Sequence, residues 1–324
     1  MRKQLLACLA LALTLGANAQ WKPAGDKIKT PWAEQVNPQQ VLPEYPRPQM
    51  ERTDWVNLNG EWQYAIRPKG EMNPQQFDGS ILVPFAIESS LSGVQKEVGA
   101  QHELWYQRTF NVPASWKGKQ VILNFGAVDW LADVFVNDIL IGSHQGGFTP
   151  FSFNVTPYLN GQNNQKLTVR VWDPSDQGYQ PRGKQVAKPE GIWYTPVTGI
   201  WQTVWLEPVA TDHIQTIKAV PDVDHQVIGV TVTTSTPCPA NIVEVQLIDK
   251  GTVVATAKGV QGKELRIGMQ HPQLWSPDTP YLYDLKVTLK KNGKTVDEVK
   301  SYTAFRKISA QRDANGIMRM FLNN

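Results

Sequence analysis

Short β-prone segments separated by turn residues recur along this chain from residue 54 to residue 305, and no helical period persists beyond one or two turns. In 121–125 both faces of the segment are largely apolar, which is typical of a strand buried inside a β-sandwich. At 136–141 the turn-forming pair Asn137-Asp138 separates two β-prone runs and predicts a hairpin. The sequence therefore predicts an all-β protein.

The strand candidates form two groups. The first predicts an antiparallel two-sheet domain that ends near Pro208, with strands at 62–66, 105–112, 120–125, 132–136, 166–172 and 200–206. The second has turns about every eight to twelve residues, as in an immunoglobulin-like β-sandwich, with strands at 213–220, 227–234, 242–249, 252–257, 282–289 and 296–305. Neither group contains an internal repeat, and we treat them as two domains.

The N-terminus has the features of an export signal. Arg2 and Lys3 form a basic start, residues 5–15 form an apolar run, and an A-x-A cleavage site follows at 17–19. We therefore expect a signal peptide at 1–19 and a periplasmic or secreted protein. No later segment approaches the ~20 apolar residues that span a bilayer, so no membrane partner is expected.

Residues 20–48 are rich in Pro and Gln. Because proline lacks the N–H that helices and central strands need, this segment can form neither at any length. We expect a Pro-rich, extended arm that lies across a domain and is pinned by Trp21 and Trp32.

Composition argues against several kinds of function. The formal net charge is only +3, and no Lys or Arg cluster stands out beyond Lys290-Lys291, so nucleic acid is not an expected partner. The five histidines lie far apart without zinc-ligand spacing, and no glycine loop resembles a phosphate cradle, so neither a metal nor a cofactor is expected. Cys238 is the single cysteine after the signal segment and cannot form an internal disulfide.

Residues 191–207, reading GIWYTPVTGIWQTVWLE, carry three tryptophans. An indole offers a flat apolar face and one N–H donor, so it suits the C–H patches and hydroxyls of a sugar. The other interpretation is that these side chains fill a sandwich core, as large aromatic residues generally do. Within the whole chain, we expect Trp201 and Trp205 in the core of the last strand, and Trp193 at the rim of a site.

Seven motifs together resemble the N-terminal, non-catalytic half of glycoside hydrolase family 2, the family of β-galactosidases, β-glucuronidases and β-mannosidases. They follow the family's order along the chain: LNGEW at 58–62, VPF at 83–85, LWYQRTF at 104–110, FGAVDW with VFVND at 125–138, HQGGFTPF at 144–151, GIWQTVWLE at 199–207 and LWSPDTPYLY at 274–283. The resemblance implies a jelly-roll sugar-binding domain at 49–209, followed by an immunoglobulin-like β-sandwich at 210–304.

The tail resembles the start of the family's catalytic (β/α)₈ barrel. Residues 305–308 and 316–323 are similar to the hairpin that leads into that barrel, so 305–324 is expected to be the first part of a truncated barrel. A barrel needs about 250 residues, and the family's acid/base lies within an Asn-Glu pair that this sequence lacks. We therefore nominate no catalytic residue and expect these 324 residues alone to be inactive.

The resemblance also implies that jelly-roll loops at 92–103 and 180–193 reach the mouth of the barrel pocket. β-Galactosidase-like members have an acidic residue just ahead of the tryptophan that matches Trp193. Here the nearest candidate is Glu190, which is separated from the tryptophan by Gly191-Ile192. Galactose specificity is therefore not implied.

Three further side chains are candidates for substrate contact, each with a plainer alternative. Arg182 and Lys184 can donate to sugar hydroxyls or to an acidic sugar, and the alternative is a solvated loop. Asp129 can accept from sugar hydroxyls, or it is a buried turn carboxylate satisfied by backbone N–H groups. Asp173 and Asp176 carry oxygen ligands that suit calcium, but an Asx-type turn is the favoured interpretation.

Three functions remain open. The leading hypothesis is the N-terminal, non-catalytic part of a secreted family 2 β-glycosidase, which shapes the rim of a pocket that a barrel completes. The second is a stand-alone carbohydrate-binding module, and the third is a structural surface or adhesion protein of stacked sandwiches. The first two have a carbohydrate as partner, a β-glycoside or a plant or host glycan, and the first allows a homo-oligomer through the full-length enzyme.

Overall fold

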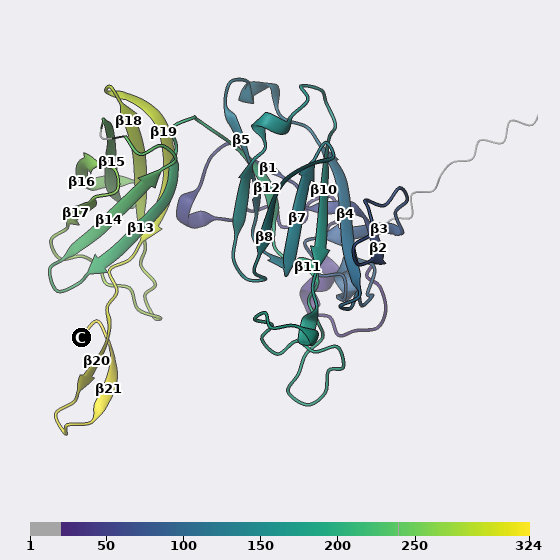
Figure 1. Ribbon diagram of the computed structural model, residues 1–324. Helices are drawn as coiled ribbons and strands as arrows, with labels where there is room; N and C mark the ends of the chain where they lie inside the picture. Colours follow the sequence, from purple (N-terminus) through teal and green to yellow (C-terminus); the bar gives the residue numbers. More distant parts are fainter. Residues whose placement is uncertain (1–20, 239) are drawn as a thin grey trace, which may run out of the picture.

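The computed structural model describes residues 21–238 and 240–324, and the expected signal peptide at 1–19 lies outside them. The described residues form two β-sandwiches that lie side by side, and a two-stranded hairpin extends from the second (Figure 1). The all-β fold class is confirmed, with a jelly-roll sandwich followed by an immunoglobulin-like one. Within the described ranges, no helix is both long and apolar enough to cross a membrane.

The first sandwich has a six-stranded and a four-stranded antiparallel sheet. The six-stranded sheet has the order β3-β2-β4-β10-β7-β8 and comprises β2 (Gly60–Pro68), β3 (Gly79–Val83), β4 (His102–Phe110), β7 (Leu131–Val136), β8 (Ile139–Gln145) and β10 (Gln165–Trp172). The four-stranded sheet has the order β1-β12-β5-β9 and comprises β1 (Val56–Asn57), β5 (Gln120–Phe125), β9 (Phe151–Asn154) and β12 (Val204–Val209). The hairpin predicted at 136–141 is confirmed, since β7 and β8 pair across Asn137-Asp138.

Alternating side chains of these strands fill one apolar core. Trp62 and Tyr64 of β2 are buried, and Leu104 and Tyr106 of β4 pack in the same cluster. This spacing follows from the period of two in a strand, which sends every second side chain to the same face. The ring of Trp62 meets that of Tyr106 edge to face, with 6.3 Å between ring centroids.

A third, two-stranded sheet lies at one end of the first sandwich, where β6 (Val128–Asp129) pairs with β11 (Gly199–Ile200). The segment from β10 to β11 extends beyond the sheets at this end (Figure 1). We call residues 178–198 the rim loop. Short 3₁₀ helices occur at η1 (Pro31–Gln35), η2 (Pro48–Met50), η3 (Ser90–Ser92), η4 (Ala114–Trp116), η5 (Thr156–Tyr158) and η6 (Ser175–Gln177).

The second sandwich has a three-stranded sheet, β13-β14-β17, and a four-stranded sheet, β16-β15-β18-β19. Their strands are β13 (Ile214–Asp222), β14 (Val227–Thr234), β15 (Asn241–Asp249), β16 (Thr252–Val260), β17 (Glu264–Gly268), β18 (Tyr283–Lys291) and β19 (Lys294–Thr303). A separate core, with the fully buried Phe305 and Tyr283 meeting edge to face, holds the two sheets together. The final hairpin consists of β20 (Ile308–Arg312) and β21 (Met318–Leu322).

The strand predicted at 200–206 is wrong, because the chain changes sheets within it. Ile200 belongs to β11 and pairs with β6, whereas Val204 begins β12 and pairs with β5. Between them, the carbonyl of Thr203 accepts the N–H of Gly126 at 2.9 Å. The segment predicted as one strand is therefore divided between two sheets. The sequence also failed to predict β3, β9 and β17.

The arm does lie across the first sandwich, but one of its two predicted anchors is wrong. Trp32 is 68% exposed, so its side chain is not a buried anchor. Trp21 lies against Gly93, where an added Cβ would meet the indole ring at 2.9 Å. Beyond it, Ala24 and Ser90 exchange hydrogen bonds, from the Ala24 N–H to the Ser90 carbonyl at 2.9 Å and from the Ser90 hydroxyl to the Ala24 carbonyl at 2.5 Å.

Candidate functional site

The rim loop is shaped by hydrogen bonds within itself. The N–H of Tyr194 donates to the carbonyl of Lys184 at 2.8 Å, and the N–H of Val186 donates to the carbonyl of Tyr194 at 3.0 Å. At the tip, the N–H of Trp193 donates to the carbonyl of Glu190 at 3.0 Å. These contacts turn a segment rich in Pro and Gly back on itself and fix the backbone that carries Trp193.

Asp129 connects the rim loop to the sandwich. It is only 2% exposed, and its carboxylate accepts a hydrogen bond from the Gln185 side chain at 3.0 Å. The other end of the Gln185 amide accepts the N–H of Val197 at 2.7 Å. Gly147 approaches so closely that a Cβ there would lie 2.3 Å from Asp129. Because burial outweighs the Gln185 bond, and Asp173 adds a like charge, the pKa of Asp129 is raised to about 7.

Exposed aromatic side chains surround this end of the sandwich. Trp193 is 41% exposed, Tyr194 is 64% exposed, and Phe148, on the turn after β8, is 52% exposed. Trp201 meets Phe148 edge to face and donates its indole N–H to the Gly147 carbonyl at 2.7 Å. The surface therefore combines flat apolar rings with main-chain polar groups, which is the chemistry that a sugar needs.

The predicted site residues lie at one end of the sandwich, but they differ in burial and in the contacts that they make. Asp129 is buried behind Gln185, and among the described residues its carboxylate accepts its hydrogen bond from that side-chain amide and not from a backbone N–H. Lys184 lies over the ring of Tyr194, with its Nζ 5.8 Å from the ring centroid. Arg182 and Glu190 form no ion pair with any residue in 21–238 or 240–324. Lys184, Glu190 and Trp193 are all exposed, and Trp193 is the one of these three that offers an aromatic face to a ligand.

A second layer of polar groups lies behind Asp129. Thr198 contacts two buried carboxyl groups, those of Glu88 and Asp173. The favoured Asx-type turn is present, since Asp173 accepts the N–H of Ser175 at 2.8 Å. Within the described ranges no group of three or more His, Cys, Asp or Glu side chains is arranged to hold a metal ion. The sequence analysis missed Gln185, Glu88 and Thr198. No motif indicates that these side chains hold the rim loop against the sandwich.

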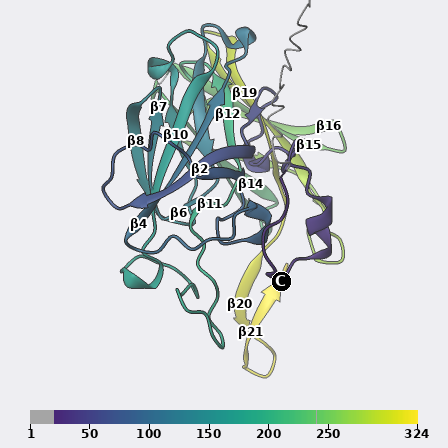
Figure 2. The same cartoon turned by 90° about the vertical axis from the view of Figure 1, so that its right-hand side faces the viewer.

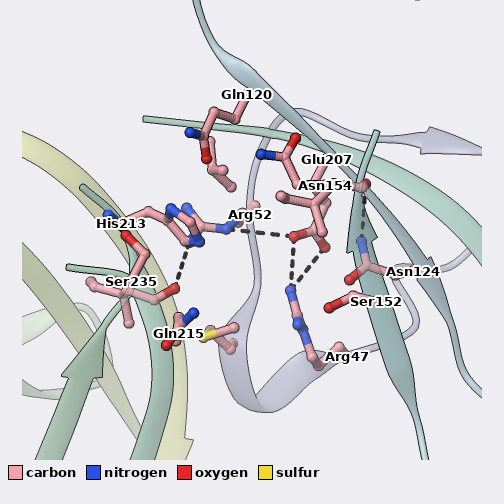
Figure 3. A pocket seen from close by; sticks show the side chains of 14 residues that line it. Arg47, Arg52, Gln120, Asn124, Ser152, Asn154, Glu207, His213, Gln215 and Ser235 are labelled. Carbon is pink, nitrogen blue, oxygen red and sulfur yellow. Dashed lines mark hydrogen bonds and ion pairs between the residues drawn. The ribbon is translucent and has the colours of Figure 1, made fainter. Parts of the chain in front are cut away.

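A polar cavity of about 330 Å³ lies between the two sandwiches (Figure 3). Amide and hydroxyl side chains from β5 and β9 line one wall, and His213 and Gln215 line the other. Its charged groups are already paired: Glu207 accepts from Arg47 at 2.8 and 3.0 Å, and Arg52 bonds Asp297 at 2.5 and 2.9 Å. We call Arg47, Glu207, Arg52 and Asp297 the interdomain clamp.

Trp205 was expected in the sandwich core, and it is buried in another place. It is 3% exposed and lies on the outer face of β12, where the guanidinium of Arg47 covers its ring at 5.8 Å. Its indole N–H donates to Glu207 at 2.5 Å. The arm therefore occupies the sheet face on which this indole could have met a ligand, and the rim is the better candidate site.

Two family models match the chain in succession. "Glycosyl hydrolases family 2, sugar binding domain" matches residues 55–207, and "Glycosyl hydrolases family 2" matches residues 212–306. A β-galactosidase of Thermoanaerobacter pseudethanolicus is 28% identical over 275 residues, which cover 80% of this chain and 36% of that protein. A β-glucuronidase of Paenibacillus borealis is 26% identical over 277 residues, covering 79% of this chain and 46% of that protein.

Solved structures agree on the fold. The β-glucuronidase of Ruminococcus gnavus in complex with D-glucuronic acid matches with a TM-score of 0.68 and 18% identity. The match covers 87% of this chain and 50% of that one. The chain thus spans about half the length of this enzyme and about a third of the length of the β-galactosidase. It belongs to glycosyl hydrolases family 2 and contains the family's sugar-binding domain followed by its immunoglobulin-like domain.

Proposed function

We propose that this chain forms the rim of the sugar pocket of a secreted β-glycosidase, with the pocket completed by a barrel domain. The rim loop supports this most: it carries the half-exposed Trp193, and Gln185 ties it to Asp129. The rim loop and hairpin β20–β21 extend from the same side of the molecule in both views (Figures 1 and 2). A domain that follows the hairpin would therefore face the rim. The signal peptide expected at 1–19 supports export.

The substrate that fits this proposal is a β-glycoside, because the relatives are named β-galactosidases and β-glucuronidases. Trp193 offers a face for the C–H side of a sugar ring, and Arg182 and Lys184 on the same loop can donate to hydroxyls or to a uronic carboxylate. Retaining cleavage requires two carboxyl groups about 5 Å apart. The rim loop has one carboxylate, Glu190, so its role is to position the sugar.

Trp193→Ala is expected to weaken substrate binding in a version of the protein extended through a barrel. Loss of one stacking ring should raise KM for an aryl β-glycoside about tenfold, with kcat changed about threefold or less. Steady-state kinetics with nitrophenyl β-galactoside and β-glucuronide would measure this. Trp32→Ala is the matched control, because Trp32 is also exposed but lies on the arm. An unchanged KM in Trp193→Ala would contradict the rim role.

The 324 residues alone are expected to leave both nitrophenyl glycosides uncleaved, because positioning without a pair of catalytic carboxyl groups does not break the bond. Release of nitrophenol above the buffer rate is the measurement. Turnover by the 324-residue protein would overturn the proposal. If the extended version were also inactive and the 324 residues bound glycans, the carbohydrate-binding module would be the better description.

A further inference from the structure

Three carboxyl groups lie buried together behind the rim loop, and the proposed function uses only one of them. Glu88, Asp129 and Asp173 are each 2% exposed. They come from separate parts of the fold: the segment between β3 and η3, strand β6, and the residue after β10. Burying three carboxyl groups is costly, so their common position suggests that they have a role.

Both ends of the rim loop are fastened to this group. At its C-terminal end the N–H of Thr198 donates to Glu88 at 2.9 Å, and its hydroxyl donates to Asp173 at 3.2 Å. At its N-terminal end the side chain of Gln180 reaches Asp173 at 3.5 Å and the carbonyl of Ser175 at 2.7 Å. Two carboxyl groups therefore share one threonine, directly before β11.

Among the residues that the structure describes, no Lys, Arg or His side chain forms an ion pair with these three acids. Tyr106 on β4 and Asp173 are ionisable neighbours of Glu88, and Asp173 in turn faces Asp129. Lys27 of the arm lies nearby, but its ammonium donates to the main-chain carbonyl of Glu88, at 3.1 Å, and not to the carboxyl group. The second oxygen of the Glu88 carboxyl is buried and has no hydrogen-bond partner within residues 21–238 and 240–324.

These surroundings favour the protonated acids. Burial raises the pKa of Glu88 to about 7 despite the Thr198 bonds, and Asp173 adds to the rise by its like charge. Burial also raises the pKa of Asp173. Near neutral pH Glu88 therefore gains or loses a proton, which changes the total charge of Glu88 and Asp173. Thr198 is hydrogen-bonded to both carboxyl groups, so this change acts directly on its contacts.

We propose that Glu88 and Asp173 are positioning residues for the rim loop: through Thr198 they hold it docked while the pair carries at most one negative charge, and ionisation of both releases it. This inference rests on the proposed function, because the loop that the pair holds is the one that carries Trp193. Two like charges on one threonine repel in a buried site, whereas one neutral and one charged acid can both accept its hydrogen bonds.

Trypsin can report on the docked loop without any sugar. Arg182 and Lys184 are cleavage sites within the rim loop, and each needs the surrounding backbone to open before a protease can bind it. The rate of cleavage at these sites is measured at pH 6 and pH 8.5 on the folded 324-residue protein. Each rate is divided by the rate for a small peptide substrate at the same pH, which removes the pH response of trypsin itself.

The wild-type loop is expected to be cleaved about tenfold faster at pH 8.5 than at pH 6, since one pKa unit of coupling corresponds to a factor of ten. Glu88→Gln cannot ionise and should reduce this ratio to about two or less. The control is Glu103→Gln, because Glu103 is also buried, at 5% exposure, but lies 4.0 Å from Arg170. This control should keep the wild-type ratio.

Thr198→Val tests the contact between the rim loop and the two acids by changing the loop residue instead of an acid. It keeps the N–H that reaches Glu88 but removes the hydroxyl that reaches Asp173, so cleavage at pH 6 should rise severalfold. Circular dichroism checks that each variant is folded, and Asp173→Asn replaces Glu88→Gln if the latter does not fold. A wild-type rate without pH response, or a Glu88→Gln loop with the full response, overturns the inference. Neither result bears on the Trp193 kinetics, so failure of the proposed function is detected separately.

Discussion

Glu207→Ala is expected to lower the free energy of unfolding by about 3–5 kcal/mol, which is the usual effect of removing one partner from a buried ion pair. Glu207 is 2% exposed and accepts hydrogen bonds from Arg47, from the indole of Trp205 and from the hydroxyl of Tyr45 at 2.5 Å. Arg52 Nε lies 3.5 Å from the same carboxylate. Burial, together with this carboxylate, raises the pKa of Tyr45 to about 12. Removing the carboxylate leaves the buried indole of Trp205, and the partly buried Arg47 and Tyr45 donors, without this acceptor.

Urea denaturation followed by tryptophan fluorescence measures this change. The control is Glu61→Ala, because Glu61 is an exposed residue of β2, where a surface substitution is expected to change stability by about 0.5 kcal/mol or less. Glu207→Gln separates charge from hydrogen bonding, since it keeps an acceptor oxygen without the negative charge. A loss below ~1 kcal/mol in Glu207→Ala would contradict the view that the clamp holds the arm and the two sandwiches together.

Glu88 is expected to reduce the stability of the fold by about 3 kcal/mol as the pH rises from 4.5 to about 7. Its pKa in the folded protein is raised from 4.5 to about 7, so the folded state binds the proton more tightly than the unfolded state does. The stabilisation is therefore complete below pH 4.5 and is lost as the pH rises through about 7. The direction is opposite to that of an ion-paired carboxylate such as Asp78, whose pKa is lowered through contacts with Ile66 and Arg67 that outweigh burial.

The difference in unfolding free energy between wild type and Glu88→Gln isolates this contribution from all other titrations. The wild type should match or exceed the variant near pH 4.5 and fall about 3 kcal/mol relative to it by pH 8. Urea titrations at intervals of one pH unit give the curve. A difference that stays constant across this range would show that Glu88 does not change its proton affinity on folding.

Much of the fold follows from the strand pattern, because burial on alternate faces leaves a period of two in the sequence. The segments expected at 120–125 and 227–234 coincide with β5 and β14. The strand pattern fails where tertiary contacts determine which sheet a residue joins. Residues 200–206 were expected to form one strand, and only their partners, β6 and β5, divide them between two sheets. The burial of Trp205 was foreseen, but its place beneath Arg47 depends on an arm with no regular pattern.

The candidate site was predictable only in part, for a related reason. Trp193 and Asp129 belong to types that commonly contact sugars, so each could be selected from the sequence. Their anchors are ordinary polar residues whose role depends on distant partners: Gln185 is 56 residues from Asp129, and Thr198 is 110 residues from Glu88. Contacts between residues so far apart in the chain cannot be predicted from the local sequence. Arg182 stays a predicted sugar donor, and its Nε is buried without a hydrogen-bond partner among the described residues, a detail that the sequence could not show.

The interdomain clamp determines how this protein can be divided into separately produced pieces. Asp297 of the second sandwich accepts both Arg52 and the N–H of Ile214, the first residue of β13, at 2.7 Å. A cut near residue 210 would place Arg52 and Asp297 on different molecules and expose both ions to water. Each fragment would then carry a charged, formerly buried patch. A stable fragment should therefore retain both sandwiches, and calorimetry of the intact chain should give one cooperative transition rather than two.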